Sequence, residues 1–441
     1  MNEWFEAEQR VERAHELFES GRWEDALREL RAAISVNPYQ GEWHFNMGLT
    51  LNAMGRPDEA IDCFERALEF HGEDAEILSQ LGLALLRVRK PEEAVPHFER
   101  AAQIDPDSEL PYCHLIAAHT QLEDHDQAEV MFYLACQVND ASPHGYFNVA
   151  VSLLDRGEAD RAAWCLNRVR RIDENYPDVY ARLGEAYWLK GEQERAYRCL
   201  LRQLRLDPAD VDSLMDLGEL LNEMDRPLEA AEKFRRVTEV EPTHAEAHFH
   251  LGDLSLQAHR LDAAQMAFEL VLRLHPAHPQ AHQKLAAIAL RRQRHEEARR
   301  HLRAELALLN SEAEPAEGRE ELAQLLLDAQ MPREAAEVLT LVVAEDPEDP
   351  RLRHQLAVAQ FMDGHLLEGI RTCRHAIRLD PDYLLAMHNL ALAHLQLGQV
   401  KRAGYWVARA LEVDPHDTRV RHLRTRIAMA TLKQRIRNLF P

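Results

Sequence analysis

The stretch Tyr180-Ala181-Arg182-Leu183-Gly184-Glu185-Ala186-Tyr187 runs on through Ala196 and Leu200 to Pro208. Its aliphatic Leu183, small Gly184 and small Ala196 have counterparts at steps of 34 residues along nearly the whole chain. Small residues at fixed offsets allow two helices to approach closely, because a larger residue there would overpack the contact at a cost of about 1–3 kcal/mol. A self-similar period of this length indicates one structural unit copied many times.

Three columns define the period. The first is aliphatic and holds Met47, Leu81, Leu115, Val149, Leu183, Leu217, Leu251, Leu285, Leu322, Leu356 and Leu390. The residue that follows each of these is glycine or alanine, except at Ile116. The third column is alanine from Ala26 to Ala403, except at Gly369.

Prolines mark the ends of the expected helices. Most periods close on a proline, as at Pro38, Pro106 and Pro208, and proline bars the preceding residue from helical geometry. A second set lies between the small and alanine columns, where proline suits the first turn of a new helix: Pro57, Pro91, Pro227 and Pro332. Each unit is therefore predicted to be helix, tight turn, helix and polar loop.

These columns and turns resemble the tetratricopeptide repeat (TPR) family, with about twelve tandem units over residues 7–417. The resemblance implies an all-α fold, a right-handed α-solenoid of tandem helix-turn-helix repeats with a concave groove and capped ends. We expect repeats one to eight in residues 7–310, repeats nine to twelve in residues 319–417, and a basic C-terminal capping helix in residues 418–441.

The period lengthens to 37 residues once, and residues 311–318 are predicted to form the longer loop. One interpretation is a tolerated surface insertion, because lengthening a loop costs little free energy. The other is a hinge between a block of eight repeats and a block of four.

Residues 418–441 contain seven basic side chains and no carboxylate. Val420, Leu423 and Ile427 fall at helical spacing, so one face can seal the last repeat. Two alternatives to a simple cap stay open: docking of this helix on an acidic surface of the same or a second chain, and attachment to a membrane surface.

The whole chain has 52 basic and 75 acidic residues, a net charge of −23, which argues against a general nucleic-acid binder. Residues 1–8 lack the basic and apolar regions of a secretory signal, and no apolar run reaches the ~18 residues of a membrane span. The six cysteines form no C-x-x-C pair. These features predict a cytoplasmic protein.

No motif for catalysis or for a cofactor occurs: the P-loop, the dinucleotide fingerprint, the H-E-x-x-H zinc motif and the G-x-S-x-G elbow are all absent. Two groups of histidines are spaced for chelation, His244/His248/His250 and His275/His278/His282, but no third or fourth ligand with metal-site spacing accompanies them. We expect no enzyme activity, no metal and no cofactor.

Function is expected on the inner face of the solenoid. The residue before the aliphatic column is polar in every unit, and in the family this position lines the groove. The residue before that includes Phe45, Phe147 and Phe249, which recur every third unit. The predicted peptide-binding groove comprises Phe45, Asn46, Gln80, Phe147, Asn148, Arg182, Glu185, Trp188, Glu219, Phe249 and Asp253.

Aromatic residues beside carboxylates form a plausible seat for a basic, amphipathic or extended peptide. The alternative is that the phenylalanines are half-buried packing residues and the acids only contact water. The sequence thus predicts a non-enzymatic scaffold or adaptor that binds a partner protein. The rival prediction is a self-assembling structural protein that forms homo-oligomers through the basic C-terminal helix or an acidic surface.

Overall fold

The computed structural model describes residues 2–309 and 318–439, and this part of the chain consists of α-helices and their connections, without a β-strand. It divides into two compact units, residues 1–233 and 234–441, each of which is described by itself. The division lies within α14 (Pro227–Val240). Proline columns and small columns continue across it, so the sequence carries no signal for a boundary there.

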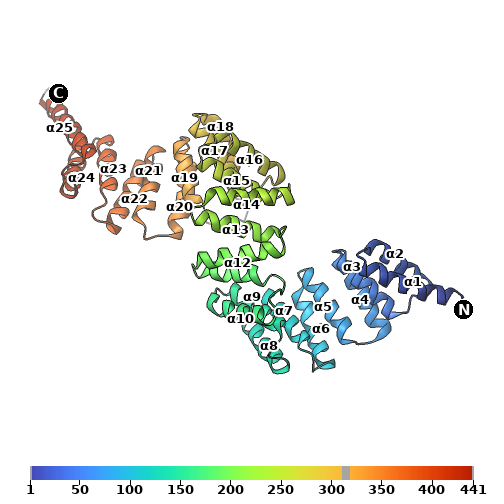
Figure 1. Ribbon diagram of the computed structural model, residues 1–441. Coiled ribbons are helices and arrows are strands. Elements are labelled where there is room, and N and C mark those ends of the chain that lie inside the picture. Colours follow the sequence, from blue (N-terminus) through green and yellow to red (C-terminus); the bar gives the residue numbers. More distant parts are fainter. Residues whose placement is uncertain (1, 310–317, 440–441) are drawn as a thin grey trace. The chain divides into compact units, whose positions relative to one another are not determined.

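The first unit follows the expected order of helix pairs, in which short turns join the two members of a pair (Figure 1). Its helices are α1 (Asn2–Glu19), α2 (Trp23–Val36), α3 (Gly41–Ala53), α4 (Pro57–His71), α5 (Ala75–Arg87), α6 (Pro91–Ile104), α7 (Leu110–Gln121), α8 (His125–Val138), α9 (Pro143–Asp155), α10 (Ala159–Ile172), α11 (Val179–Leu189), α12 (Gln193–Leu206) and α13 (Val211–Glu223).

The second unit repeats the same order and ends on one longer helix. Its helices are α15 (Ala245–Gln257), α16 (Leu261–Leu274), α17 (Ala281–Arg291), α18 (His295–Leu309), α19 (Arg319–Asp328), α20 (Pro332–Glu345), α21 (Pro350–Met362), α22 (Leu366–Leu379), α23 (Leu384–Gln396), α24 (Val400–Val413) and α25 (Thr418–Leu439). The predicted all-α repeat fold is confirmed, and the four turn prolines are the first residues of α4, α6, α14 and α20.

The small column lets the two helices of a pair touch. A Cβ atom built on Gly82 of α5 would lie 2.5 Å from the ring of Phe98, which α6 holds fully buried. Gly48 stands in the same relation to Phe64, again at 2.5 Å. The absence of a side chain on the first helix therefore makes the space that the ring of the second helix fills.

In every unit, one residue of the turn between the paired helices adopts the left-handed backbone conformation. Gly55 does so with φ 71° and Gly191 with φ 72°. In six units a residue with a side chain takes this strained position, with φ between 57° and 61°: Arg89, Glu123, Asp225, His259, Gln293 and Gln330.

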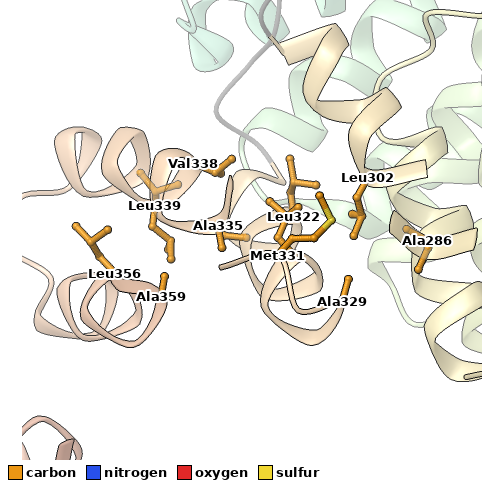
Figure 2. Close-up of a cluster of buried hydrophobic side chains, with 14 of the residues drawn as sticks. Ala286, Leu302, Leu322, Ala329, Met331, Ala335, Val338, Leu339, Leu356 and Ala359 are labelled. Atoms are coloured by element: carbon orange, nitrogen blue, oxygen red, sulfur yellow. The ribbon is translucent and has the colours of Figure 1, made fainter. Parts of the chain in front are cut away.

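The core of the second unit continues across the long loop between α18 and α19. One cluster of buried side chains joins Ala286 of α17 and Leu302 of α18 to Leu322 of α19 and Leu356 of α21 (Figure 2). Residues 311–317 of the predicted loop lie outside the described residues. The hinge between the two predicted blocks of repeats therefore stays a prediction.

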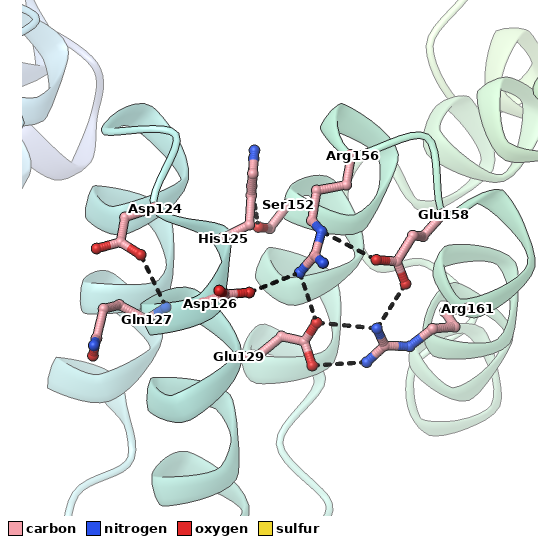
Figure 3. A network of polar contacts seen from close by, with 9 residues as sticks. All are labelled: Asp124, His125, Asp126, Gln127, Glu129, Ser152, Arg156, Glu158 and Arg161. Carbon is pink, nitrogen blue, oxygen red and sulfur yellow. Dashed lines mark hydrogen bonds and ion pairs between the residues drawn. The ribbon is translucent and has the colours of Figure 1, made fainter.

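An ion-pair network ties α8, α9 and α10 together in the first unit (Figure 3). Both oxygens of Glu129 accept hydrogen bonds from Arg161, at 3.0 and 2.9 Å, and Arg156 Nη1 donates to Glu129 at 3.1 Å. Arg156 also pairs with Asp126 at 3.3 Å and with Glu158 at 3.1 Å. The hydrogen bond from Arg161 lowers the pKa of Glu129, which stays ionised within the network.

The last helix, α25, closes the second unit. Val420, Leu423 and Ile427 are buried in one cluster with Val407 and Ala410 of α24. The apolar face found at helical spacing thus packs on the last pair. Met429 and Leu432, further along the helix, are exposed.

The close contact in the small column predicts that alanine substitutions at two glycines change the free energy of unfolding in opposite directions. Gly82→Ala should reduce the free energy of unfolding by about 1–3 kcal/mol, because the buried Phe98 ring must move. Gly145→Ala of α9 meets only ordinary contacts, the nearest being Cys113 Sγ at 3.7 Å. It should gain about 0.5–1 kcal/mol from helix propensity. Urea denaturation followed by circular dichroism measures both, and equal shifts would refute the packing argument.

Candidate functional site

The first helices of successive pairs share one face, and polar side chains on it bond from one helix to the next. Arg87 Nη1 donates to Asn52 Oδ1 at 2.6 Å, and Asn148 Nδ2 donates to the Cys113 carbonyl at 2.7 Å. Each bond spans 35 residues, one repeat and one position. Asn148 belongs to the polar column, so this column uses part of its hydrogen-bonding capacity to hold neighbouring repeats together.

This inner face is hollowed over α5, α7, α9 and α11. A cavity of about 990 Å³ lies there, and its lining includes Arg87, Arg89, Asp155, Asn148 and Arg182. Burial raises the pKa of Asp155, since water is withdrawn from its carboxylate. Two residues of the predicted groove, Asn148 and Arg182, therefore line the same cavity.

A second cavity of about 430 Å³ adjoins the first at Arg182, which lines both. We call it the acidic cavity, because it holds five carboxylates and one guanidinium. Its lining consists of Asp178, Ala181, Arg182, Glu185, Trp188, Asp210, Asp212, Ser213, Met215 and Asp216.

Three of the five carboxylates have fixed partners. Arg182 Nη1 pairs with Glu185 Oε2 at 2.8 Å. Gln203 Nε2 donates to both Asp178 and Asp210, each at 3.2 Å. Asp210 also caps α13, accepting from the Ser213 N–H at 3.1 Å. These contacts hold the acidic groups close together against their mutual repulsion.

Asp216 experiences that repulsion most directly. Burial of its carboxyl group, reinforced by the charges of Glu219, Glu185 and Asp212, raises the pKa of Asp216 to about 6, although Arg182 acts in the opposite direction. A cation that entered the cavity would relieve both effects, because it would supply a counter-charge at a site that water reaches poorly.

Trp188 forms the aromatic wall of the acidic cavity. Its indole Nε1 donates to Glu223 Oε2 of α13 at 2.7 Å, and its side chain is half-buried. The hydrogen bond to the next first helix fixes the indole plane, so little conformational entropy is lost if a ligand packs on it.

The three phenylalanines of the predicted groove lie half-buried against the core. Phe45 packs on Phe64 at 5.8 Å between ring centroids, Phe147 packs on Tyr176 at 5.0 Å, and Phe249 stacks on His278 at 4.8 Å. This placement corresponds to the packing interpretation. None of the three lines the inner cavities described above, and their contact with a partner stays a prediction.

The remaining predicted residues are spread along both units. Asn46 and Gln80 are half-buried on α3 and α5, and Glu219 lies on α13 beside Asp216. Asp253 lies in the second unit, where its carboxylate pairs with Lys284 at 3.5 Å. The structure thus brings Arg182, Glu185 and Trp188 together in the acidic cavity, with Asn148 in the cavity that adjoins it at Arg182. The other predicted groove residues line neither of these two cavities.

The predicted groove residues do not include Asp216, Asp210 or Met215, although Asp216 stands in the polar column and Met215 in the column that precedes it. Asp216 occupies the same polar column as Arg182, one repeat later, so the column by itself indicates a place on the inner face. Asp210 reads in the sequence only as a helix cap. Its place in the cavity depends on Gln203, whose side chain reaches it from the second helix of the preceding repeat.

The histidine groups are engaged in contacts of other kinds. His278 Nε2 lies 2.9 Å from Glu246 Oε2, His282 Nδ1 lies 3.0 Å from His301 Nδ1, and His248 Nε2 lies 3.0 Å from the Pro242 carbonyl. In the described part of the chain, no set of three or more His, Cys, Asp or Glu side chains is arranged to hold a metal ion. Nor is any helix there long and apolar enough to cross a bilayer.

Paired helices with a polar, hollowed inner face define a helical-repeat protein. Sequence profiles of the tetratricopeptide repeat match residues 11–53, 39–107, 177–210, 221–288 and 360–427. The chain belongs to the tetratricopeptide repeat family. Repeats of this family generally mediate protein–protein interactions.

Similar proteins differ widely in size and source. A TPR repeat-containing thioredoxin, TTL4, of Arabidopsis thaliana is 37% identical over 71 residues, which are 15% of this chain and only 10% of that protein. A tetratricopeptide repeat protein of Parabacteroides merdae is 18% identical with a TM-score of 0.48, covering 57% of this chain and 99% of that one. Yeast Tom70 is 15% identical with a TM-score of 0.39, covering 98% and 96% of the two chains.

The raised pKa of Asp216 predicts how stability depends on pH. The folded state keeps the Asp216 proton up to a pH of about 6, whereas the ordinary value is 3.8, so ionisation of this group costs stability as the pH rises through that range. Asp216→Asn removes the cost. We expect its unfolding free energy to exceed that of the wild type by about 1–3 kcal/mol at pH 8 and to match it near pH 4.

Urea denaturation at the two pH values measures this difference. Asp212→Asn is the matched control, because it removes the same charge from an exposed position of the same cavity and should produce a smaller pH-dependent gap. A gap for Asp216→Asn that is the same at both pH values would contradict the burial argument.

Proposed function

We propose that this chain is a non-enzymatic interaction scaffold or adaptor that binds a basic, amphipathic segment of a partner protein on the inner face of its first unit. The observation that carries this proposal is the acidic cavity, in which five carboxylates and one guanidinium surround the fixed indole of Trp188. Such a site favours a lysine or arginine side chain that is followed by an apolar one.

The charges of the cavity give the proposed complex its selectivity. A cationic side chain would approach the exposed Asp212 and the half-buried Asp216, whose carboxylate gains a counter-charge on binding. An acidic segment would meet like charges in the same place, which costs affinity. The adjoining cavity of about 990 Å³ gives an extended segment room to continue along α9, α7 and α5.

We further propose a cytoplasmic location and no catalytic role. The six cysteines are unpaired thiols, and burial raises the pKa of Cys113 and of Cys373 to about 12, which makes both poor nucleophiles. Unpaired structural cysteines are typical of a reducing compartment.

Anisotropy of a labelled twelve-residue peptide that alternates lysine and leucine tests the groove. We expect this peptide to bind, its glutamate-for-lysine counterpart to bind at least about tenfold more weakly, and binding to weaken with salt. Trp188→Ala should weaken binding about tenfold or more, because it removes the aromatic wall. The control Trp164→Ala removes an exposed indole from a second helix, α10, and should have little effect.

Equal binding of the lysine and glutamate peptides would refute the charge selectivity. Equal losses in the two tryptophan variants would refute the inner-face assignment. Circular dichroism of each variant confirms that the helices are retained.

The rival function, self-assembly, draws support from the exposed Met429 and Leu432 at the far end of the basic helix α25. Light scattering at several salt concentrations separates the two functions. We expect a monomer at all of them, whereas an oligomer that dissociates as salt rises would support self-assembly through charged surfaces.

A further inference from the structure

The second unit has a cavity of about 600 Å³ between α22 and α24, the second helices of two successive pairs. Its lining is made of Arg371, Arg374, Arg378 and Arg409 with Ile377, Pro381 and Trp406. We propose that this arginine cavity binds a phosphate monoester carried on an apolar organic group. The proposal concerns second helices and does not rest on the inner groove of the first unit.

The four guanidinium groups lack acidic partners. The lining contains no carboxylate, and within residues 4–309 and 318–432 no Asp or Glu forms an ion pair with any of the four. The acid next to Pro381, Asp380, instead accepts the Asp382 N–H at 3.0 Å. In a chain with 75 acidic and 52 basic residues, four arginines around one cavity without a counter-ion are an imbalance that an anion would correct.

Some arginines on or directly before second helices elsewhere in the chain have an acidic partner three residues away. Arg195 pairs with Glu192 at 2.5 Å, Arg226 with Glu229 at 2.6 Å, and Arg236 with Glu239 at 2.7 Å. Each pair spans three residues along the chain, the spacing at which helical side chains meet. None of the four arginines of the cavity has such a local pair in the described part of the chain.

The repeat fold does not require arginine at these positions. In the first unit the equivalent residues of α8 are Val130, Tyr133 and Gln137, displaced by the same 241 residues that separate Ala128 from Gly369 in the alanine column. Between α8 and α10 there is a cavity of about 520 Å³ whose lining holds four aromatic side chains, among them Phe132 and Trp164, and a single arginine, Arg161. The architecture thus supplies an outer groove, and the sequence alone makes the one in the second unit cationic.

Arg409 and Trp406 give this cavity a fixed wall. Arg409 Nη2 donates to the Pro381 carbonyl at 3.3 Å, and its guanidinium carbon lies 5.8 Å from the centre of the Trp406 ring. These two contacts hold the guanidinium in place, and most of its five N–H groups are left to face a ligand. Arg371, Arg374 and Arg378 are exposed on one face of α22, so their side chains can close on an anion without unfolding any element.

The number of arginines favours a phosphate over a carboxylate. A phosphate monoester carries close to two negative charges near neutral pH and three terminal oxygens, so it can accept hydrogen bonds from several guanidiniums at once. A carboxylate carries one charge and two oxygens. The cavity also exceeds the size of a bare phosphate, and Ile377 and the Trp406 ring provide the apolar surface that an attached organic group would cover.

Isothermal titration calorimetry on the full chain tests the assignment, with phenyl phosphate, inorganic phosphate, benzoate and a nine-residue phosphotyrosine peptide as probes. We expect phenyl phosphate to bind at least about fivefold more tightly than inorganic phosphate and about tenfold more tightly than benzoate. A peptide that binds more tightly than phenyl phosphate identifies a phosphorylated partner as the natural source. Equal affinities identify a small phosphate ester, and both results uphold the site.

Paired double variants separate the cavity from the general charge of this region. Arg374→Gln with Arg378→Gln should weaken phenyl phosphate binding at least about tenfold, whereas Arg424→Gln with Arg426→Gln, which removes the same charge from exposed positions of α25, should change it less than about twofold. The four substituted arginines are all exposed, so circular dichroism should show unchanged helicity in both double variants.

Three results would overturn the proposal. The first is no measurable binding of phenyl phosphate to the wild type at millimolar concentration. The second is an equal loss of affinity in the two double variants. The third is a short single-stranded oligonucleotide that binds more tightly than phenyl phosphate and loses the same affinity in both double variants, which would indicate a diffuse nucleic-acid surface instead of a phosphate site.

Discussion

The close approach of the two helices in each pair is the constraint on which both units depend. Gly82 and Gly48 leave room for the fully buried rings of Phe98 and Phe64, so the helices are held by interlocking shape and not by burial alone. This spacing repeats every 34 residues and thereby fixes which side chains can enter the core. Side chains that face solvent are left to vary with little effect on the fold.

The side chains left free to vary carry opposite charges on the first helices of the first unit and on the second helices of the second unit. On the inner face of the first unit, five carboxylates surround one arginine, and burial with the neighbouring charges raises the pKa of Asp216 to about 6. On second helices of the second unit, four arginines surround a cavity without a carboxylate in its lining. Both arrangements leave charge uncompensated within the chain, and each is balanced most simply by a ligand of the opposite charge.

The fold could be predicted from the sequence almost completely, because packing columns and turn prolines are local signals that recur in phase. Pro57 and Pro91 begin α4 and α6 as expected, and the apolar stripe of α25 is buried as expected. The division within α14 could not be predicted, since the proline and alanine columns of this repeat match those of the other repeats.

The candidate site was predicted less well, for a physical reason. Arg182, Glu185 and Trp188 lie within seven residues on one helix, so their proximity is readable from the sequence. The contributions of Asp210 and Gln203 arise from contacts between repeats, which spacing alone does not define. The same holds for Arg409, which joins the arginines of α22 only through the packing of the next pair.

Stability could be gained at the turns between paired helices. Six of them place a side chain in the left-handed conformation that Gly55 and Gly191 adopt at the same position of other repeats. Each such residue carries backbone strain of roughly 1–2 kcal/mol that glycine would not. The heat tolerance of this chain could therefore be raised one repeat at a time, by exchanges remote from either charged cavity, for example at His259 or Gln330.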